Sequence, residues 1–148
     1  MQQQTVPAAV SAEICARIDQ FYAAQMQMLD EGNVGGWVAT FAVDGVFESN
    51  GLPEPSRGRA ALTALAAAAV ARLDAQGAIR RHFVFNVIVE PQDGDVLRTT
   101  CYVPVFDTVG GVTTLTTSTV MRDELTVSGA ELLVRHRTVT RDDLLVRS

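Results

Sequence analysis

The chain has 148 residues, a net charge of −5 and 47% hydrophobic residues. This length and composition are typical of one folded domain, so we expect residues 1–148 to form a single domain. The acidic balance argues against a nucleic acid or an anionic membrane surface as a partner. The alanine-dominated run 64–71 is too short to span a bilayer, and we therefore expect a soluble, cytoplasmic protein.

The first half of the chain predicts three helices. The first begins after Ser11, a good N-cap, and continues with hydrophobic residues at helical spacing as far as Gly32. Asp30 falls near the end of this helix, at the edge of its apolar face. The remaining elements of this half are a second, short helix (33–41), a turn at Asp44–Gly45, a short strand (46–49), a loop (50–57) and an alanine-rich helix (58–74).

The second half predicts strands, of which the segment from Arg80 to Glu90 is the central one. It is rich in β-branched and aromatic residues and stops at a proline. Strict alternation places two sets on opposite faces: His82, Val84, Asn86 and Ile88 on one, and Phe83, Phe85, Val87 and Val89 on the other. Turn residues then separate three more predicted strands, 96–106, 112–127 and 130–141.

Helices followed by strands favour an α+β fold. We predict a cone-shaped open barrel in which three N-terminal helices pack on one face of a curved antiparallel sheet, with a pocket inside. Both faces of the central strand are mostly apolar, whereas the helices can cover only one of them. We therefore predict a homodimer formed through the convex face.

His82 is the main candidate for chemistry, because histidine titrates near neutral pH and can act as a general base. A carboxylate on its other ring nitrogen would set the tautomer, and Asp30 is the candidate for that role. The alternative is a core histidine bonded to a backbone carbonyl, with Asp30 merely near a helix end. The chain has two histidines and lacks HxH, HxxxH and HExxH spacings, so we expect neither a metal nor a cofactor.

Five further residues are candidates for contacting a small-molecule ligand. Four are aromatic and could line a cavity or simply form core: Tyr22, Trp37, Phe41 and Tyr102. Asn86 could orient a ligand carbonyl or hydroxyl, or bond to a neighbouring strand. By contrast, we expect an exposed or interface position for His136, which lies among Arg135, Arg137 and Arg141.

Three stretches resemble the SnoaL-like group of the nuclear transport factor 2-like cone fold. They are Leu29–Asn33 followed by Trp37, Phe41–Phe47 with Arg57–Arg59, and Arg81–Asn86. The group includes polyketide cyclases, scytalone dehydratase-like and bile-acid dehydratase-like enzymes, and the small subunits of aromatic-ring dioxygenases. The resemblance covers nearly the whole chain and agrees with the predicted fold.

The resemblance to the dehydratase-like members implies that His82 and Asp30 act together as a catalytic pair. It implies a cofactor-independent enzyme that dehydrates, isomerises or cyclises a small, largely apolar oxygenated molecule of polyketide or polycyclic type. Leu29 stands where scytalone dehydratase-like members have a catalytic tyrosine, and the strand with Cys101 and Tyr102 carries no second histidine. The alternative is a non-catalytic small-ligand-binding protein or a small structural subunit of a ring-hydroxylating dioxygenase.

Overall fold

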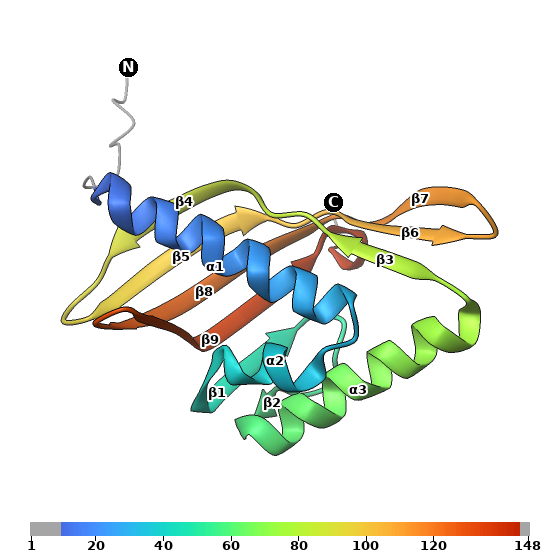
Figure 1. Cartoon of the computed structure of the whole chain (residues 1–148), viewed down its shortest axis with the longest axis horizontal. Coiled ribbons are helices and arrows are strands. Elements are labelled where there is room, and N and C mark those ends of the chain that lie inside the picture. The colour runs from blue at the N-terminus through green and yellow to red at the C-terminus, as the bar shows by residue number, and fades with distance from the viewer. Residues whose placement is uncertain (1–9, 146–148) are drawn as a thin grey trace.

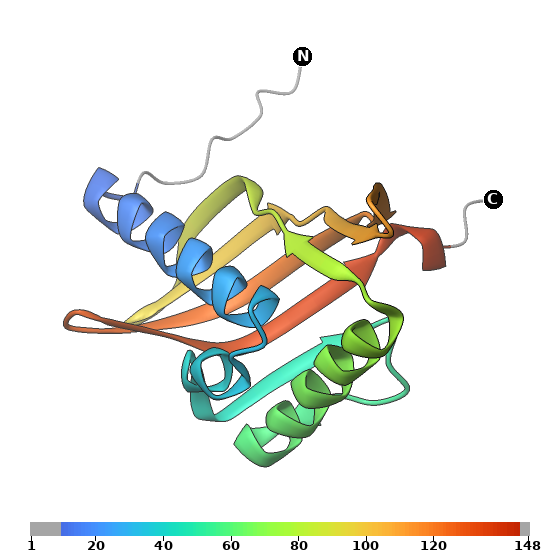
Figure 2. The same cartoon turned by 45° about the vertical axis from the view of Figure 1, so that its right-hand side comes forward.

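The computed structural model of the chain describes residues 10–145 and contains three helices on one side of a curved sheet (Figures 1 and 2). They are α1 (Ala12–Asp30), α2 (Val34–Ala39) and α3 (Gly58–Gln76). The side chain of Ser11 caps α1 by accepting a hydrogen bond from the backbone N–H of Ile14 at 3.2 Å. Gly77 ends α3 in the left-handed conformation, which glycine adopts without strain. The predicted α+β class and its three N-terminal helices are confirmed. No helix among residues 10–145 is long and apolar enough to cross a membrane.

Six strands form the large sheet, and their order is β2-β1-β9-β8-β5-β4. Their bounds are β1 (Phe41–Ser49), β2 (Ser56–Arg57), β4 (Phe85–Pro91), β5 (Val96–Tyr102), β8 (Thr119–Ser128) and β9 (Glu131–Arg141). A short 3₁₀ turn, Asp142–Leu144, follows β9. The strand pairs are antiparallel except β1 and β9, which run parallel. The prediction of a wholly antiparallel sheet is therefore wrong at this pair, because β1 leaves the helical half and is joined to β9 only by a long crossover. The sheet curves around the helices without closing into a barrel (Figure 2).

The start of the sheet also differs from the prediction. The residues Asp44–Gly45, predicted as a turn, lie inside β1, where pairing with β9 jumps from Phe41 to Val46. This irregularity absorbs the turn residues within a continuous strand. The predicted loop likewise contains β2, which pairs antiparallel with the end of β1.

Three strands form a second, smaller sheet in the order β3-β6-β7. Their bounds are β3 (Ile79–His82), β6 (Val105–Val109) and β7 (Val112–Thr117). Each of the three long strands predicted between residues 80 and 127 is thus broken into two, and the chain passes from one sheet to the other at each break. Pro104 lies in one break, where it cannot donate a backbone hydrogen bond to a neighbouring strand. The β6–β7 hairpin consequently projects beyond the large sheet (Figure 1).

A bulge at Asn86 changes which side chains of β4 face inward. Asn86 has φ of 55°, and the pairing with β5 runs from Phe85 opposite Tyr102 to Ile88 opposite Thr100, so β4 contains one extra residue. The extra residue reverses the alternation beyond it. Ile88 is therefore 50% exposed while Val89 is buried, and the predicted division of this strand into two faces is wrong beyond Asn86.

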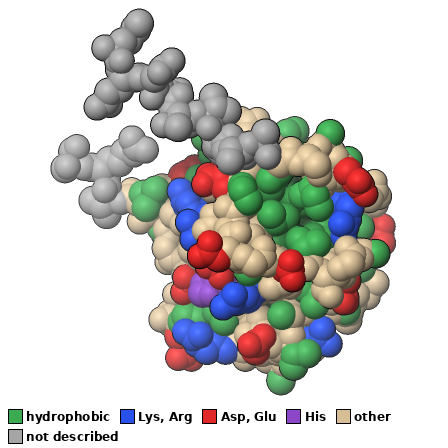
Figure 3. Space-filling view, turned by 90° about the vertical axis from the view of Figure 1, so that its left-hand side faces the viewer, with side chains coloured by type: hydrophobic (Ala, Val, Ile, Leu, Met, Phe, Trp, Pro, Cys, Tyr) green, Lys and Arg blue, Asp and Glu red, His purple; other side chains and the backbone are tan. Residues whose placement is uncertain are grey.

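The hydrophobic core lies between the helices and the concave face of the large sheet. Its buried side chains come from all three helices and from most strands, and they include Ile18, Trp37, Phe41, Leu62, Ala66, Cys101, Met121, Leu125 and Val134. The outer surface is mixed, but in Figure 3 hydrophobic side chains gather in one area at the end of the molecule that holds the start of α1 and the β4–β5 and β8–β9 turns. The core side chains fill the centre of the concave face, and a cavity lies beside α3.

Candidate active site

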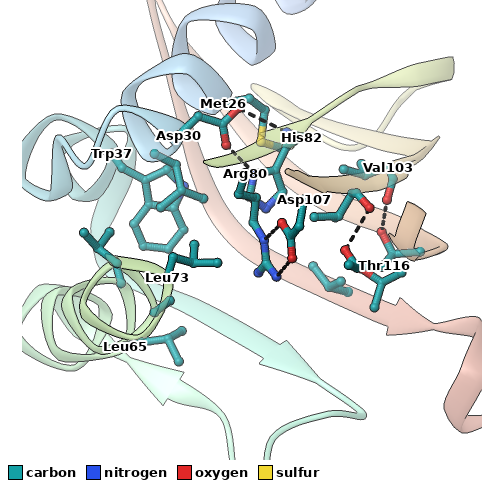
Figure 4. A pocket seen from close by; sticks show the side chains of 18 of the residues that line it. Met26, Asp30, Trp37, Leu65, Leu73, Arg80, His82, Val103, Asp107 and Thr116 are labelled. Atoms are coloured by element: carbon teal, nitrogen blue, oxygen red, sulfur yellow. Dashed lines mark hydrogen bonds and ion pairs between the residues drawn. The ribbon is translucent and has the colours of Figure 1, made fainter. Parts of the chain in front are cut away.

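A cavity of about 1030 Å³ lies between the end of α1, helices α2 and α3, strand β3 and the concave face of the sheet. This volume is at the upper end of the ~300–1,000 Å³ range of ligand pockets. Helix α3 contributes small and aliphatic lining residues: Leu65, Ala66, Ala69, Val70 and Leu73. The large sheet contributes Met121 and Val139, and Val103 and Val105 come from the break after β5 and the start of β6. The polar groups Arg80, His82 and Asp107 lie on the side formed by β3 and β6 (Figure 4). The α3 side also carries Arg72 and Asp74, and β9 contributes Arg137 and Arg141, so aliphatic and charged side chains are combined around the cavity. Such a lining suits a small organic ligand that carries polar groups.

Asp30 and His82 meet on this wall, although 52 residues separate them in the sequence. Asp30 is the last residue of α1 and His82 the last residue of β3. The Oδ1 atom of Asp30 lies 2.6 Å from Nδ1 of His82, and Oδ2 accepts the backbone N–H of His82 at 3.1 Å. The side chains of Asp30 and His82 are only 6% and 18% exposed. One carboxylate thus binds both the ring and the backbone of the histidine.

This arrangement sets the chemistry available to His82. A carboxylate can only accept, so the neutral imidazole carries its proton on Nδ1 and has its lone pair on Nε2. Within residues 10–145, no protein group hydrogen-bonds to Nε2. The ring therefore offers a free base to the cavity, and its carboxylate partner would stabilise the imidazolium that forms on protonation.

Sequence reasoning missed a second charged pair on the same wall. Arg80 in β3 donates two hydrogen bonds to Asp107 in β6, at 2.7 and 2.8 Å. The hydrogen bond from Arg80 holds the pKa of the Asp107 carboxyl below its usual value, and the same contact raises the pKa of Arg80. Both residues line the cavity beside His82 (Figure 4). Their meeting depends on the register of β3 with β6, which places them opposite each other and which the sequence alone does not reveal.

The remaining candidates divide into one residue in the cavity wall and four outside it. Trp37 lines the cavity with Asp30 and His82. Phe41 is completely buried in the core and Tyr102 is 52% exposed on the other face of the sheet. The Asn86 side chain is also exposed, because the bulge turns it away from the cavity. These placements do not support the ligand contacts predicted for Phe41, Tyr102 and Asn86.

Tyr22, the fourth predicted ligand-contacting residue that lies outside the cavity wall, belongs to a buried polar network. Its hydroxyl lies 2.5 Å from Oγ1 of Thr99 and donates to Oδ2 of Asp123 at 2.7 Å. Arg137 donates twice to the same Asp123, at 2.9 Å each, and once to Gln25 at 2.6 Å. Tyr22 therefore joins α1 to the sheet, and its predicted ligand contact is not supported.

Arg137 itself is 2% exposed, so its charge lies inside the protein. Burial alone would lower the pKa of its guanidinium, but the ion pair with Asp123 outweighs burial and raises that pKa. Arg137 also lines the cavity, on the same face of β9 as Val139 and Arg141.

Burial raises the pKa of the nearby Cys101 thiol to about 12, which leaves the thiol protonated and unreactive near neutral pH.

One donor in the cavity wall has no partner. Nε1 of Trp37 is buried, and no residue within 10–145 accepts its N–H. The ring itself is well packed, with its centroid 4.8 Å from that of the Phe41 ring and 6.1 Å from that of the Phe47 ring.

Residues 10–145 contain no group of three or more His, Cys, Asp or Glu side chains placed to bind a metal ion.

Comparison with known families identifies the fold to which this cavity belongs. The profile of the SnoaL-like domain matches residues 11–138, which is most of the chain and includes Asp30, Trp37, His82 and Arg137. The chain belongs to the SnoaL-like family. The resemblance seen in the sequence is thereby confirmed, together with the nuclear transport factor 2-like architecture. No curated protein matches the chain.

Several solved structures share this fold over nearly the whole chain. Aln2 from a Streptomyces species is 34% identical with a TM-score of 0.84, covering 91% of this chain and 95% of its own. ActVI-ORFA from Streptomyces coelicolor is 30% identical with a TM-score of 0.81, covering 90% and 100%. A protein from Catenulispora acidiphila, solved in complex with S-DNPA, is 28% identical with a TM-score of 0.79, covering 90% and 96%.

Proposed function

We propose that this protein is a cofactor-independent enzyme that uses His82 and Asp30 for general acid–base chemistry on a small, largely apolar oxygenated molecule. The observation that carries the proposal is the contact of Asp30 with both the ring and the backbone of His82, in the wall of a cavity large enough for a polycyclic ligand. Membership of the SnoaL-like family and the S-DNPA complex of a relative support a small molecule as the ligand.

The proposed reaction begins with a proton on the carbon next to a ligand carbonyl. Nε2 of His82 takes this proton, the C–H bond breaks, and its electron pair moves into an enolate whose oxygen carries the negative charge. Asp30 stabilises the resulting imidazolium. In a dehydration the imidazolium returns the proton to a leaving hydroxyl, which departs as water, and in an isomerisation it returns the proton to another carbon of the ligand. In a ring closure the enolate carbon forms a bond to the carbon of a second carbonyl, whose C=O π electrons move to oxygen, and that oxygen takes the proton. Dehydration, isomerisation and ring closure all share this first step.

The shared step can be tested without knowing the natural substrate. In D2O, removal and return of a proton next to a carbonyl exchanges hydrogen for deuterium, which proton NMR follows directly. We propose 1-tetralone, a bicyclic ketone, as the probe, and we expect the protein to accelerate exchange at its α-carbon. His82→Ala should lower this acceleration by about 10²–10⁴-fold, the usual contribution of a general base. Asp30→Asn should retain part of the rate and shift its pH profile, because the imidazole remains but its charged partner is lost.

His136→Ala is the matched control, because His136 pairs with Glu48 on the outer surface at 3.1 Å and is not among the cavity residues. We expect this variant to keep the parent rate. A parent protein that binds the ketone without accelerating exchange would contradict the proposal and favour the non-catalytic alternative. A His82→Ala variant that exchanges at the parent rate would contradict it as well.

A further inference from the structure

The unpartnered Trp37 indole is the feature of the cavity that the His82 and Asp30 chemistry does not use. A buried N–H without an acceptor is costly, and most buried donors in proteins have a partner. Trp37 is 3% exposed, and Nε1 lacks an acceptor within residues 10–145. Because the same residue lines the cavity, the missing acceptor fits an oxygen atom of a bound ligand.

Trp37 lies close to the residues proposed to carry the reaction. Helix α2 starts four residues after Asp30, and its N-cap Asn33 accepts the backbone N–H of Gly36 at 2.9 Å, which fixes the turn that carries the indole. In Figure 4 the Trp37 ring lies beside Asp30, with Arg80 and His82 facing it across the cavity. Met26 lines the cavity beside His82 in the same view. Because Nε1 is buried, a ligand reaches the N–H by displacing side chains that cover it.

We infer that the indole N–H of Trp37 binds the carbonyl oxygen of the ligand and stabilises the negative charge that forms there. This inference rests on the proposed function for the identity of the reacting carbonyl. Removing a proton next to a carbonyl places charge on oxygen, and a fixed donor in a site shielded from water stabilises that charge strongly. The ligand class is therefore a ring compound with a ketone or quinone-type oxygen that only accepts hydrogen bonds.

The chain has a single tryptophan, so one indole signal in the NMR spectrum of the 15N-labelled protein reports this contact directly. We would titrate the protein with 1-tetralone and with tetralin, which has the same ring skeleton but no oxygen. The indole proton should move downfield with the ketone and not with the hydrocarbon, because only the ketone can accept its hydrogen bond. An indole signal that responds alike to both probes, or a protein that does not bind the ketone, would overturn the inference.

Trp37→Phe removes the donor and keeps an aromatic ring. We expect the dissociation constant for 1-tetralone to rise about three- to tenfold, the usual size of one hydrogen bond, while that for tetralin is unchanged. The rate of deuterium exchange at saturating ketone should fall further, by about 10²-fold, because the donor acts most strongly on the developing charge. Equal weakening of both probes, or an unchanged saturated rate, would contradict a role in binding the oxygen.

Phe47→Leu is the matched control, because Phe47 packs against Trp37 and lines the cavity but has no donor. It should change the affinity for both probes by the same factor. Thermal unfolding of each variant shows whether it is folded, and the NMR titration of the parent protein decides the matter if Trp37→Phe does not fold. His82→Ala should retain the downfield indole shift while losing exchange, so a failure of this inference is distinguishable from a failure of the proposed function.

Discussion

The two histidines of the chain form similar pairs in different surroundings. His82 and Asp30 are 2.6 Å apart and mostly buried, and Asp30 also binds the backbone of His82. His136 and Glu48 are 3.1 Å apart, and their side chains are 36% and 38% exposed. Water screens the outer pair, so it holds the imidazole only weakly. Burial and the second contact are therefore what make Asp30 able to set both the orientation and the tautomer of His82.

The ion pair of Arg80 with Asp107, beside His82 in the cavity wall, allows a test of stability at the residue scale. We expect Asp107→Asn to lower the free energy of unfolding by roughly 1 kcal/mol near neutral pH, because the paired side chains are only 26% and 12% exposed and hold two hydrogen bonds. Arg80 lowers the pKa of Asp107 in the folded protein, so this stability is fully present above the unfolded value of about 3.9. The stability that the pair contributes is lost as the pH falls through the lower pKa that Asp107 has in the folded protein.

Urea unfolding of the parent and the variant across this pH range measures the difference between them. Asp143→Asn is the control, because Asp143 makes the same two-bond contact with Arg141 on the surface. The control should change the free energy of unfolding much less than Asp107→Asn. A difference between parent and Asp107→Asn that stays constant as the pH falls would contradict the assigned cause.

At the scale of elements, polar side chains fix how the first helix sits on the sheets. Tyr22 and Gln25 connect the middle of α1 to Asp123 and Arg137 in β8 and β9. Asp30 connects the end of α1 to β3. These contacts are directional, whereas hydrophobic packing alone tolerates small shifts of a helix. The position of Asp30 relative to His82 thus depends on a network that starts more than one helical turn away.

The bulge in β4 makes a prediction about Asn86. Its φ of 55° is a conformation that asparagine and glycine tolerate and β-branched residues do not. We expect Asn86→Gly to change the free energy of unfolding by only a few tenths of a kcal/mol, and Asn86→Val to lower it by about 1–2 kcal/mol. Chemical denaturation of the two variants measures both values. Equal destabilisation by glycine and valine would instead indicate that the lost side chain matters.

At the scale of the whole molecule, the exposed hydrophobic residues are not spread evenly over the convex face. The exposed aromatic residues lie along the β4–β5 edge and at the break before it, where Phe83, Phe85 and Tyr102 are 42%, 51% and 52% exposed, and Ile88 beside them is 50% exposed. Other exposed hydrophobic residues lie elsewhere, including Val43 on β1 and Val112 and Leu115 on β7. Phe83 and Phe85 stack with their ring planes 3° apart. The middle of this face is charged instead, with Arg98 opposite Glu124 in the β5–β8 register. A partner would therefore cover the edge rather than the centre.

The homodimer stays a prediction, now with a defined surface. We expect sedimentation to give twice the 15.9 kDa mass of the chain at micromolar concentration. Phe85→Lys should shift the protein to the mass of one chain, because it places a charge among exposed aromatic side chains that a second copy would bury. Val43→Lys is the control, since Val43 is 73% exposed on β1, at the other side of the large sheet from β4. A single-chain mass for the parent protein would contradict the dimer.

The sequence by itself determined the class of fold, the order of the helices and the identity of the central pair. Helical spacing, turn residues and strand composition are local properties, so they survive without knowledge of the tertiary structure. They located Asp30 at the end of α1 and His82 on a strand, and the resemblance to the dehydratase-like proteins linked the two. Trp37 was likewise identified as a candidate, although nothing in the sequence showed that its N–H would lack a partner.

Only the tertiary structure decided which side chains meet, because strand register and bulges depend on packing between distant segments. If β8 and β9 paired without interruption from Ser128 opposite Glu131, Asp123 would lie opposite His136. A bulge between Glu124 and Leu125 shifts the pairing by one residue and brings Arg137 to Asp123 instead. The extra residue at Asn86 acts in the same way on β4. One inserted residue exchanges the inner and outer faces of a strand, and for that reason the sequence could not place Arg137 in the cavity wall or Asn86 outside it.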